Sequence, residues 1–251
     1  MLDKKKNILR VAGFQQDEID KVGIEELFSQ RFKAQIINLE TGKPMVEEDL
    51  TEEFKKVMKV TSLEEAVAKY DQIKASKSKN PSLCDPFDSK KDDIAGIKQR
   101  EKFSHVYLLL DESGNSVEQY VLPVRGYGLW STLKGYLAVK PDFQTIVGLT
   151  YYEHAETPGL GGEVDNDLWK AKWPDKQIYD SDGEVKIRVV KGIAGEDPYG
   201  VDGLSGATIT SNGVTNMLKY WLGPKGFGPY FKEQNTGSSS ASIQRSGGSN
   251  G

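Results

Sequence analysis

The most restrictive feature of this sequence is a change in the spacing of its apolar residues near His105. Before that point, apolar residues recur at the spacing of amphipathic helices, as in Ile8, Val11 and Ala12. From there to Glu153, short apolar runs separated by turn residues favour strands. We therefore expect an α+β protein with an antiparallel β-sheet core and flanking helices.

Local signals place the elements more closely. The expected strands cover 34–39, 105–111, 117–124, 135–139, 145–153 and 185–191. Turn residues at 112–115 and 140–143 would close two hairpins. Ser62 followed by Glu65 is a capping box that opens a helix, whereas the polar stretch 74–91 is expected to be a surface loop.

The last helix has the clearest pattern. Its apolar residues follow helical spacing at Val214, Met217, Leu218, Trp221 and Leu222. It is predicted to run from Asn212 to Leu222, before Gly223 and Pro224.

Composition excludes several function classes. The chain has 251 residues, with 33 Lys and Arg against 37 Asp and Glu, so it lacks the basic excess typical of nucleic-acid binders. One cysteine and two histidines make no plausible metal site, and Cys84 is expected to be a buried, inert thiol. The longest apolar run, 105–110, is far too short to span a membrane, and no signal peptide is recognisable.

Glycine and tryptophan point to the second half of the chain as the place where a ligand binds. Seventeen of the 26 glycines fall between Gly126 and Gly228, and all four tryptophans follow Arg125. Glycine permits close approach of the backbone, and aromatic side chains supply flat surfaces. A turn-rich β domain with no ligand explains the same composition equally well.

Three segments stand out there, at 126–131, 154–162 and 202–212. The third precedes the last helix, where free amides and the helix dipole favour an anion such as a phosphate. The simpler interpretation is that Thr210 or Ser211 merely caps the helix.

Two enzyme templates fit these segments poorly. Residues 203–207 resemble the hydrolase elbow G-x-S-x-G, but Ala207 replaces the final glycine. Residues 159–164 begin like a dinucleotide-binding loop, but Val164 replaces its last glycine. His154 and Glu156 are possible acid–base residues, although they more simply bracket a loop.

The segment Asp202-Gly-Leu-Ser-Gly-Ala-Thr208 matches the flavinylation pattern D-x-x-(S/T)-G-A-T of the FMN-binding domain family. Within it, the chain resembles the C-subunit family of bacterial Na⁺-translocating NADH:quinone reductases. Supporting segments lie at 122–124, 128–131, 148–153, 156–164, 191–192, 201–214 and 221–230.

The resemblance implies FMN joined covalently to Thr208 by a phosphoester, made by a separate flavin transferase that takes FMN from FAD. The transferase would recognise Asp202, Ser205, Gly206, Ala207 and Thr208. Leu129, Trp130 and Leu160 would form apolar walls for the flavin ring. The other expected cofactor contacts are Ser131, Glu156, Thr157, Lys191, Ser205, Gly206, Ala207 and Thr210.

The residue patterns and the resemblance together predict a domain organisation. Residues 1–100 would be a helical or mixed region packed on the core, 101–233 the FMN-binding domain, and 234–251 a flexible Ser/Gly-rich tail. Members of the family relay NADH-derived electrons toward quinone in a membrane complex that exports Na⁺, with no complete active site on this one polypeptide. Their N-terminal membrane helix is missing here, so a soluble fragment of an extracytoplasmic domain of the inner membrane is expected.

Two alternatives stay open at this point. The related ferredoxin:NAD electron-transfer complex has a component with the same attachment motif. A non-catalytic interaction module, in which Thr208 only caps a helix, would also fit the local pattern.

Overall fold

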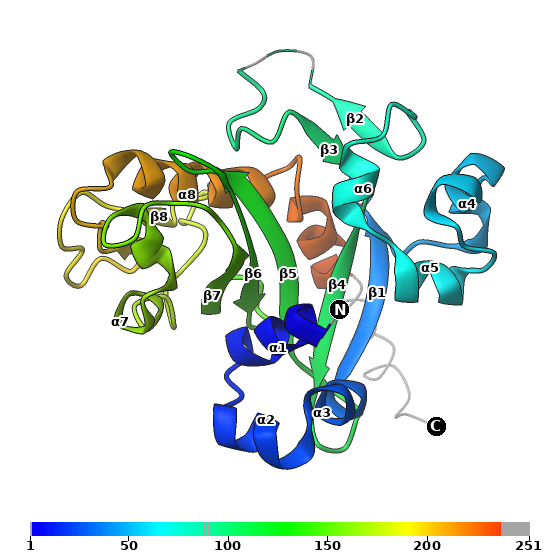
Figure 1. Ribbon diagram of the computed structural model, residues 1–251, viewed down its shortest axis with the longest axis horizontal. Helices are drawn as coiled ribbons and strands as arrows, with labels where there is room; N and C mark the ends of the chain where they lie inside the picture. Colours follow the sequence, from blue (N-terminus) through cyan, green and yellow to red (C-terminus); the bar gives the residue numbers. More distant parts are fainter. Residues whose placement is uncertain (1, 88, 90, 237–251) are drawn as a thin grey trace, which may run out of the picture.

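A five-stranded antiparallel sheet lies at the centre of the computed structural model, which describes residues 2–87, 89 and 91–236 (Figure 1). Its strand order is β1 (Phe32–Asn38), β4 (Phe103–Leu110), β5 (Val117–Tyr127), β6 (Thr132–Val139) and β7 (Ile146–Glu153). The two predicted hairpins are therefore present as β4–β5 and β6–β7, and the expected α+β class is confirmed. The N-terminal hundred residues contribute the edge strand β1, which pairs with β4.

One face of the sheet is covered by α8 (Thr208–Trp221). Val214, Met217 and Leu218 are fully buried there and belong to the same core as Leu122 and Leu137. The helix begins four residues earlier than predicted, so Thr208 to Ser211 lie inside it. The reason is that polar side chains in its first turn, Thr210 and Ser211, bond to groups outside the helix, which no periodicity reveals.

The other face carries α1 (Leu2–Val11), followed by α2 (Gln16–Val22) and α3 (Ile24–Arg31). Ile8 and Leu9 of α1 pack with Val121 and Tyr136 of the sheet. This is the amphipathic pattern expected from the sequence, because the apolar stripe of α1 faces the strands.

A third apolar cluster lies over β1 and the start of β4, beneath η1 (Glu47–Asp49), α4 (Glu52–Met58), α5 (Leu63–Lys69) and α6 (Gln72–Ser76) (Figure 1). The predicted cap at Ser62 is confirmed, because its hydroxyl accepts a hydrogen bond from the Glu65 amide at 3.2 Å. The second half of the capping box differs, since the Glu65 carboxylate accepts from the Thr61 amide at 2.8 Å instead of the Ser62 amide.

The prediction of a surface loop over 74–91 is wrong in part. It contains the end of α6 and strand β2 (Cys84–Pro86), which pairs with β3 (Gln99–Glu101). Leu83 and Cys84 are buried despite the polar residues around them, since they pack beneath the long-range pairing with β3. Cys84 is 3% exposed, as expected, and burial raises the pKa of its thiol.

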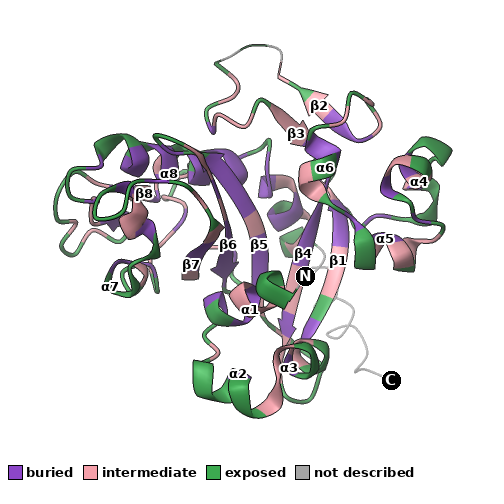
Figure 2. Cartoon of the chain, in the orientation of Figure 1, coloured by how far each residue is buried: buried purple, intermediate pink, exposed green. Residues whose placement is uncertain are grey.

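Residues 154–207 form a lobe beside β7 with little regular structure (Figures 1 and 2). It holds η2 (Gly161–Asp165), α7 (Asp167–Lys170) and the short parallel pair β8 (Arg188–Val189) and β9 (Gly200–Val201). The strand predicted over 185–191 is thus only two residues long, because the amides of Lys186 and Ile187 both donate hydrogen bonds to the Ile178 carbonyl oxygen.

After α8 a helical segment covers 228–236, and residues 237–251 of the predicted tail lie outside the described residues. Within the described ranges, no helix has the length and apolar character needed to cross a membrane. The same residues contain no cluster of side chains suited to a metal ion.

Candidate functional site

The fold brings the three sequence segments together at the edge of the sheet where β5 and β7 end and β6 begins. Residues 126–131 end β5 and turn into β6, and 154–162 leave β7 at the same edge, because Lys134 of β6 lies opposite Glu153 of β7. The segment 202–212 leads into α8, whose Gly213 lies against the backbone of Tyr127. A Cβ atom on Gly213 would come 2.4 Å from the Tyr127 carbonyl oxygen, so only glycine allows this approach.

A single buried carboxylate, that of Glu156, ties these segments together. It accepts hydrogen bonds from three successive amides, those of Leu129 at 3.1 Å, Trp130 at 2.9 Å and Ser131 at 3.0 Å. It also accepts from the hydroxyls of Ser131 at 3.2 Å and Thr210 at 2.7 Å. Glu156 is only 5% exposed, so nearly all of its hydrogen-bonding capacity is used inside the protein.

The electrostatics of Glu156 follow from these contacts. Burial alone would raise the pKa of this carboxyl, but the bonds from Thr210, Trp130, Leu129 and Ser131 outweigh burial and lower it. Glu156 is therefore ionised at neutral pH and acts as a fixed anion within a nest of amides. It holds no proton to donate, and both of its oxygens accept from protein donors, so the geometry favours a structural role for Glu156.

Close packing around Glu156 depends on a second glycine. A Cβ atom on Gly161 would come 2.5 Å from Thr210 Oγ1 and 2.8 Å from Glu156 Oε2. Gly161 therefore lets the loop after β7 pass directly over the contact between Glu156 and α8.

We expect Gly161→Ala to lower the free energy of unfolding by about 1–3 kcal/mol, because the added methyl group must displace one of these two oxygens. Urea denaturation measures the loss. In a Thr210→Ala background, where the closest atom is gone, the same substitution should cost clearly less. An equal cost in both backgrounds would show that Gly161 acts elsewhere.

Thr208 is the first residue of α8, and its side chain is exposed. The preceding residue, Ala207, caps the helix without a side-chain bond. In the part of the chain that the structure describes, the Thr208 hydroxyl has no hydrogen-bond partner, and neither have the amides of Thr208, Ile209 and Thr210. The exposed hydroxyl and these amide donors therefore lie together in the first turn of α8, at the positive end of the helix.

The capping interpretations are consequently wrong. Thr208 does not cap α8, and Thr210 is directed to Glu156. The Ser211 hydroxyl instead accepts from the Leu204 amide at 3.2 Å, which fixes the loop before the helix.

The loop that precedes Thr208 touches the second segment through Gly206. This residue has φ +68°, a conformation that favours glycine, and a Cβ atom on it would lie 2.8 Å from Leu160 Cδ2. Ser205 and Gly206 are exposed, whereas Ala207 is buried. Leu160 and the motif are therefore neighbours, as a shared ligand would require.

The carboxylate of Asp202 is held by two groups of the protein. Its Oδ1 accepts from the Ala194 amide at 2.8 Å and its Oδ2 contacts Lys172 Nζ at 2.5 Å. These bonds lower the pKa of the carboxyl, the Ala194 amide most strongly. Asp202 thereby fixes the loop carrying Lys191, whose neighbour Gly192 accepts from the Gly203 amide at 2.7 Å. Lys191 itself is exposed beside the motif.

Apolar side chains are exposed around this edge. Leu129 is 36% exposed, Trp130 65% and Leu160 43%, although large apolar side chains such as these are usually buried. Ile209, 57% exposed and next to Thr208, belongs to the same set. Sequence reasoning missed it, because Ile209 lies outside both the motif and the apolar stripe of α8.

The remaining predicted residues are placed as follows. Ser131 is half-buried, and its hydroxyl links Glu156 to the Ala155 amide. Thr157 is exposed in the second segment. His154 is half-buried and pairs with Asp165 at 2.7 Å, as expected of a loop residue.

Comparison with known proteins gives consistent results. The FMN-binding domain family matches residues 128–223. The C subunit of the Na⁺-translocating NADH-quinone reductase of Pasteurella multocida is 40% identical over 236 residues, which cover 94% of this chain and 82% of that protein. The corresponding protein of Pseudomonas aeruginosa is 41% identical over 233 residues, covering 90% and 80%.

A solved structure is similar over nearly the whole chain. The crystal structure of Shewanella oneidensis NqrC superposes with a TM-score of 0.77 at 32% identity, covering 94% of this chain and 100% of the other.

Proposed function

The chain belongs to the C-subunit family of the Na⁺-translocating NADH-quinone reductases, and on this premise we propose that it carries electrons on an FMN esterified to Thr208. Members of the family are subunits of an oxidoreductase complex. The match to the FMN-binding domain, over residues 128–223, includes Thr208 and most of the three segments described above. The observation that carries the proposal is the exposed hydroxyl of Thr208 at the first position of α8, which has no hydrogen-bond partner among the described residues.

The surroundings of Thr208 fit an FMN phosphate. The amides of the first turn of α8, which have no partner among the described residues, can donate hydrogen bonds to the phosphate oxygens, and Lys191 offers a cation beside the motif. Gly206 brings the motif against Leu160, because a Cβ atom there would lie 2.8 Å from Leu160 Cδ2. Ser205 and Thr210 are polar neighbours, although Thr210 already donates to Glu156.

The exposed apolar residues fit the flavin ring. Leu129, Trp130, Leu160 and Ile209 lie on segments that Glu156 and Gly206 bring together. A flat ring needs apolar walls and a few polar contacts, which Ser131 and Thr157 would supply. When bound, FMN supplies the electron transfer, and the protein holds and orients it.

We assign Glu156 a positioning role rather than a direct contact with the flavin. Both carboxylate oxygens are occupied by protein donors, so Glu156 fixes Leu129 and Trp130 relative to α8. Asp202 plays a similar part for the loop beside Lys191. A transferase would then meet a preformed loop with Thr208 exposed.

The attachment step balances as a phosphoryl transfer. Thr208 Oγ1 would form a bond to the FMN phosphorus of FAD, AMP would leave, and the hydroxyl proton would be lost. Nothing near Thr208 supplies a general base within hydrogen-bond distance among the described residues, since its hydroxyl has no partner. A separate flavin transferase is therefore part of the proposal.

The names of the relatives bear on the choice between the quinone reductase and the ferredoxin:NAD complex. Those named above are subunits of the quinone reductase, so we favour that complex over the ferredoxin-linked alternative. Partner subunits of the complex, coupling of electron flow to Na⁺ export and a location on the extracytoplasmic side of the inner membrane belong to the same proposal.

The proposed flavin position can be tested through Trp130. The other three tryptophans, Trp169, Trp173 and Trp221, are at most 5% exposed, so quenching by acrylamide reports almost entirely on Trp130. We expect covalent FMN to remove most of this quenching, because the ring covers the indole. A Trp130→Phe protein, measured without flavin, should show little quenching and so supplies the reference. Unchanged quenching after flavin attachment would place the ring elsewhere.

A further inference from the structure

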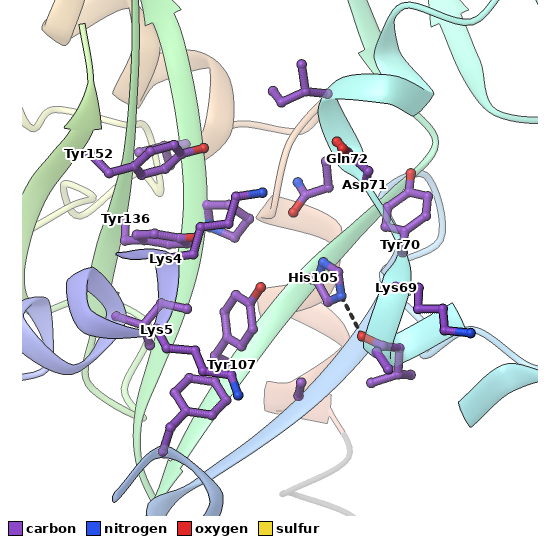
Figure 3. A pocket seen from close by; sticks show the side chains of 18 of the residues that line it. Lys4, Lys5, Lys69, Tyr70, Asp71, Gln72, His105, Tyr107, Tyr136 and Tyr152 are labelled. Atoms are coloured by element: carbon purple, nitrogen blue, oxygen red, sulfur yellow. Dashed lines mark hydrogen bonds between the residues drawn. The ribbon is translucent and has the colours of Figure 1, made fainter. Parts of the chain in front are cut away.

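A cavity lies on the opposite face of the sheet from α8, between α1 and the helices α5 and α6 (Figure 3). Its volume is about 750 Å³, within the range of small-molecule sites. It is lined by aromatic side chains of three strands, Tyr107 of β4, Tyr136 of β6 and Tyr152 of β7. Because α8 and Thr208 lie across the sheet, this cavity is separate from the proposed flavin site.

The tyrosine rings form a continuous aromatic wall. The ring centres of Tyr107 and Tyr136 are 6.1 Å apart at 79°, and those of Tyr136 and Tyr152 are 5.2 Å apart at 35°. His105 stacks on Tyr107 with ring centres 5.4 Å apart. A flat ligand could stack on one of these ring faces and meet the edge of another.

The hydroxyl groups on this wall have no partner within the described residues. Figure 3 shows those of Tyr107, Tyr136 and Tyr152 directed into the cavity. Tyr136 is only 2% exposed, so its unpaired hydroxyl depends on a ligand or water in the cavity to accept its hydrogen bond. Burial raises the pKa of Tyr136 and Tyr107, and that of Tyr152 to about 12, so all three are donors at neutral pH.

Charges in the cavity are close to balance. Lys4 has no carboxylate partner in the described part of the chain, but Glu64 and Asp71 line the facing helical wall. Lys5, Lys69 and Arg125 are paired with Glu25, Glu65 and Glu101, respectively. His105 donates from Nε2 to the Val67 carbonyl at 2.9 Å, and burial lowers its pKa, so it is neutral.

The geometry points to a binding site for a flat, uncharged ring that carries carbonyl oxygens. The aromatic wall would stack on the ring, and the hydroxyl of Tyr136, with those of Tyr107 and Tyr152, would donate to the carbonyls. The near balance of charge disfavours a strongly anionic ligand.

Calorimetric titration of the purified protein with duroquinone tests this site, with 1,2,4,5-tetramethylbenzene as a matched probe that lacks only the two carbonyls. We expect saturable binding of duroquinone, at least about fivefold tighter than the hydrocarbon. Tyr136→Phe should weaken duroquinone binding about fivefold and leave hydrocarbon binding unchanged. Tyr120→Phe, a tyrosine of β5 in the core on the α8 face, is the control that should change neither.

Three results would overturn the inference. They are the absence of saturable duroquinone binding, equal binding of the two probes, and unchanged duroquinone affinity in Tyr136→Phe. Titration with benzoate tests whether the cavity is an anion site instead. It would be one if benzoate bound more tightly than duroquinone and the Lys4→Gln substitution abolished benzoate binding. Tyr152→Phe provides a second hydroxyl deletion, expected to weaken duroquinone only, should Tyr136→Phe fold poorly.

Discussion

The Thr208→Ala protein is expected to fold normally and to gain no covalent flavin when it is incubated with flavin transferase, FAD and Mg²⁺. The substitution removes the only atom proposed to bond to phosphorus, so the loss should be complete rather than partial. Stability should change by less than about 1 kcal/mol, because Thr208 is exposed and its hydroxyl has no partner among the described residues. Flavin fluorescence of the denatured protein on a gel measures covalent attachment directly.

A matched variant distinguishes Thr208 from its neighbours. Thr132→Ala removes another partly accessible threonine hydroxyl, at the start of β6, and should be flavinylated like the parent protein. Flavin that remains on denatured Thr208→Ala protein would place the attachment at a different residue. Loss of attachment in both variants would point to impaired recognition instead of a missing acceptor.

Replacing Glu156 by alanine is expected to cost about 3–5 kcal/mol of unfolding free energy. Three amides and two hydroxyls lose their acceptor at once, and Thr210, which supplies one of the hydroxyls, is fully buried. Glu156→Gln should cost about 1–3 kcal/mol, since it keeps one acceptor but places an NH₂ group against donors. Chemical denaturation at pH 7 measures both values.

Glu153 supplies the control three residues earlier. Its carboxylate is exposed and pairs with Lys134 at 2.5 Å, so Glu153→Ala should cost less than about 1 kcal/mol. A Glu156→Ala protein as stable as Glu153→Ala would contradict the role assigned to Glu156.

The stabilising effect of Glu156 should also depend on pH. Its pKa in the folded protein is lowered from an ordinary value of 4.5, so the unfolded chain takes up a proton first as the pH falls. The contribution is fully present above pH 4.5 and is lost as the pH falls through the lowered value. The stability difference between the parent and Glu156→Gln should therefore shrink below pH 4.5. A difference that grows on acidification would have the wrong sign.

Local patterns predicted much of the fold. The hairpins β4–β5 and β6–β7, the strand β1, the cap at Ser62 and the apolar stripe of α8 all follow from spacing and turn residues within short windows. The order of the sheet does not, because the pairing of β1 with β4 joins residues about 70 positions apart. The pairing of β2 with β3, which corrected the predicted loop, is likewise a tertiary effect.

The candidate site was only partly predictable. The motif ending at Thr208 could be found in the sequence, whereas the start of α8 could not, because Thr210 and Ser211 look like capping residues. The role of Glu156 depends on donors from two other segments, and nothing in its own neighbourhood indicates them. Ile209 was missed for a similar reason, since its exposure becomes visible only when the helix is placed on the sheet.

The most direct test of the central claim is the mass of the protein after reaction with flavin transferase, FAD and Mg²⁺. Intact-mass spectrometry should show one added FMN less one water, and fragmentation of the peptide containing residues 202–212 should place that addition on Thr208. An unchanged mass under conditions that flavinylate a known family member, or an addition located on any other residue, would contradict the proposal.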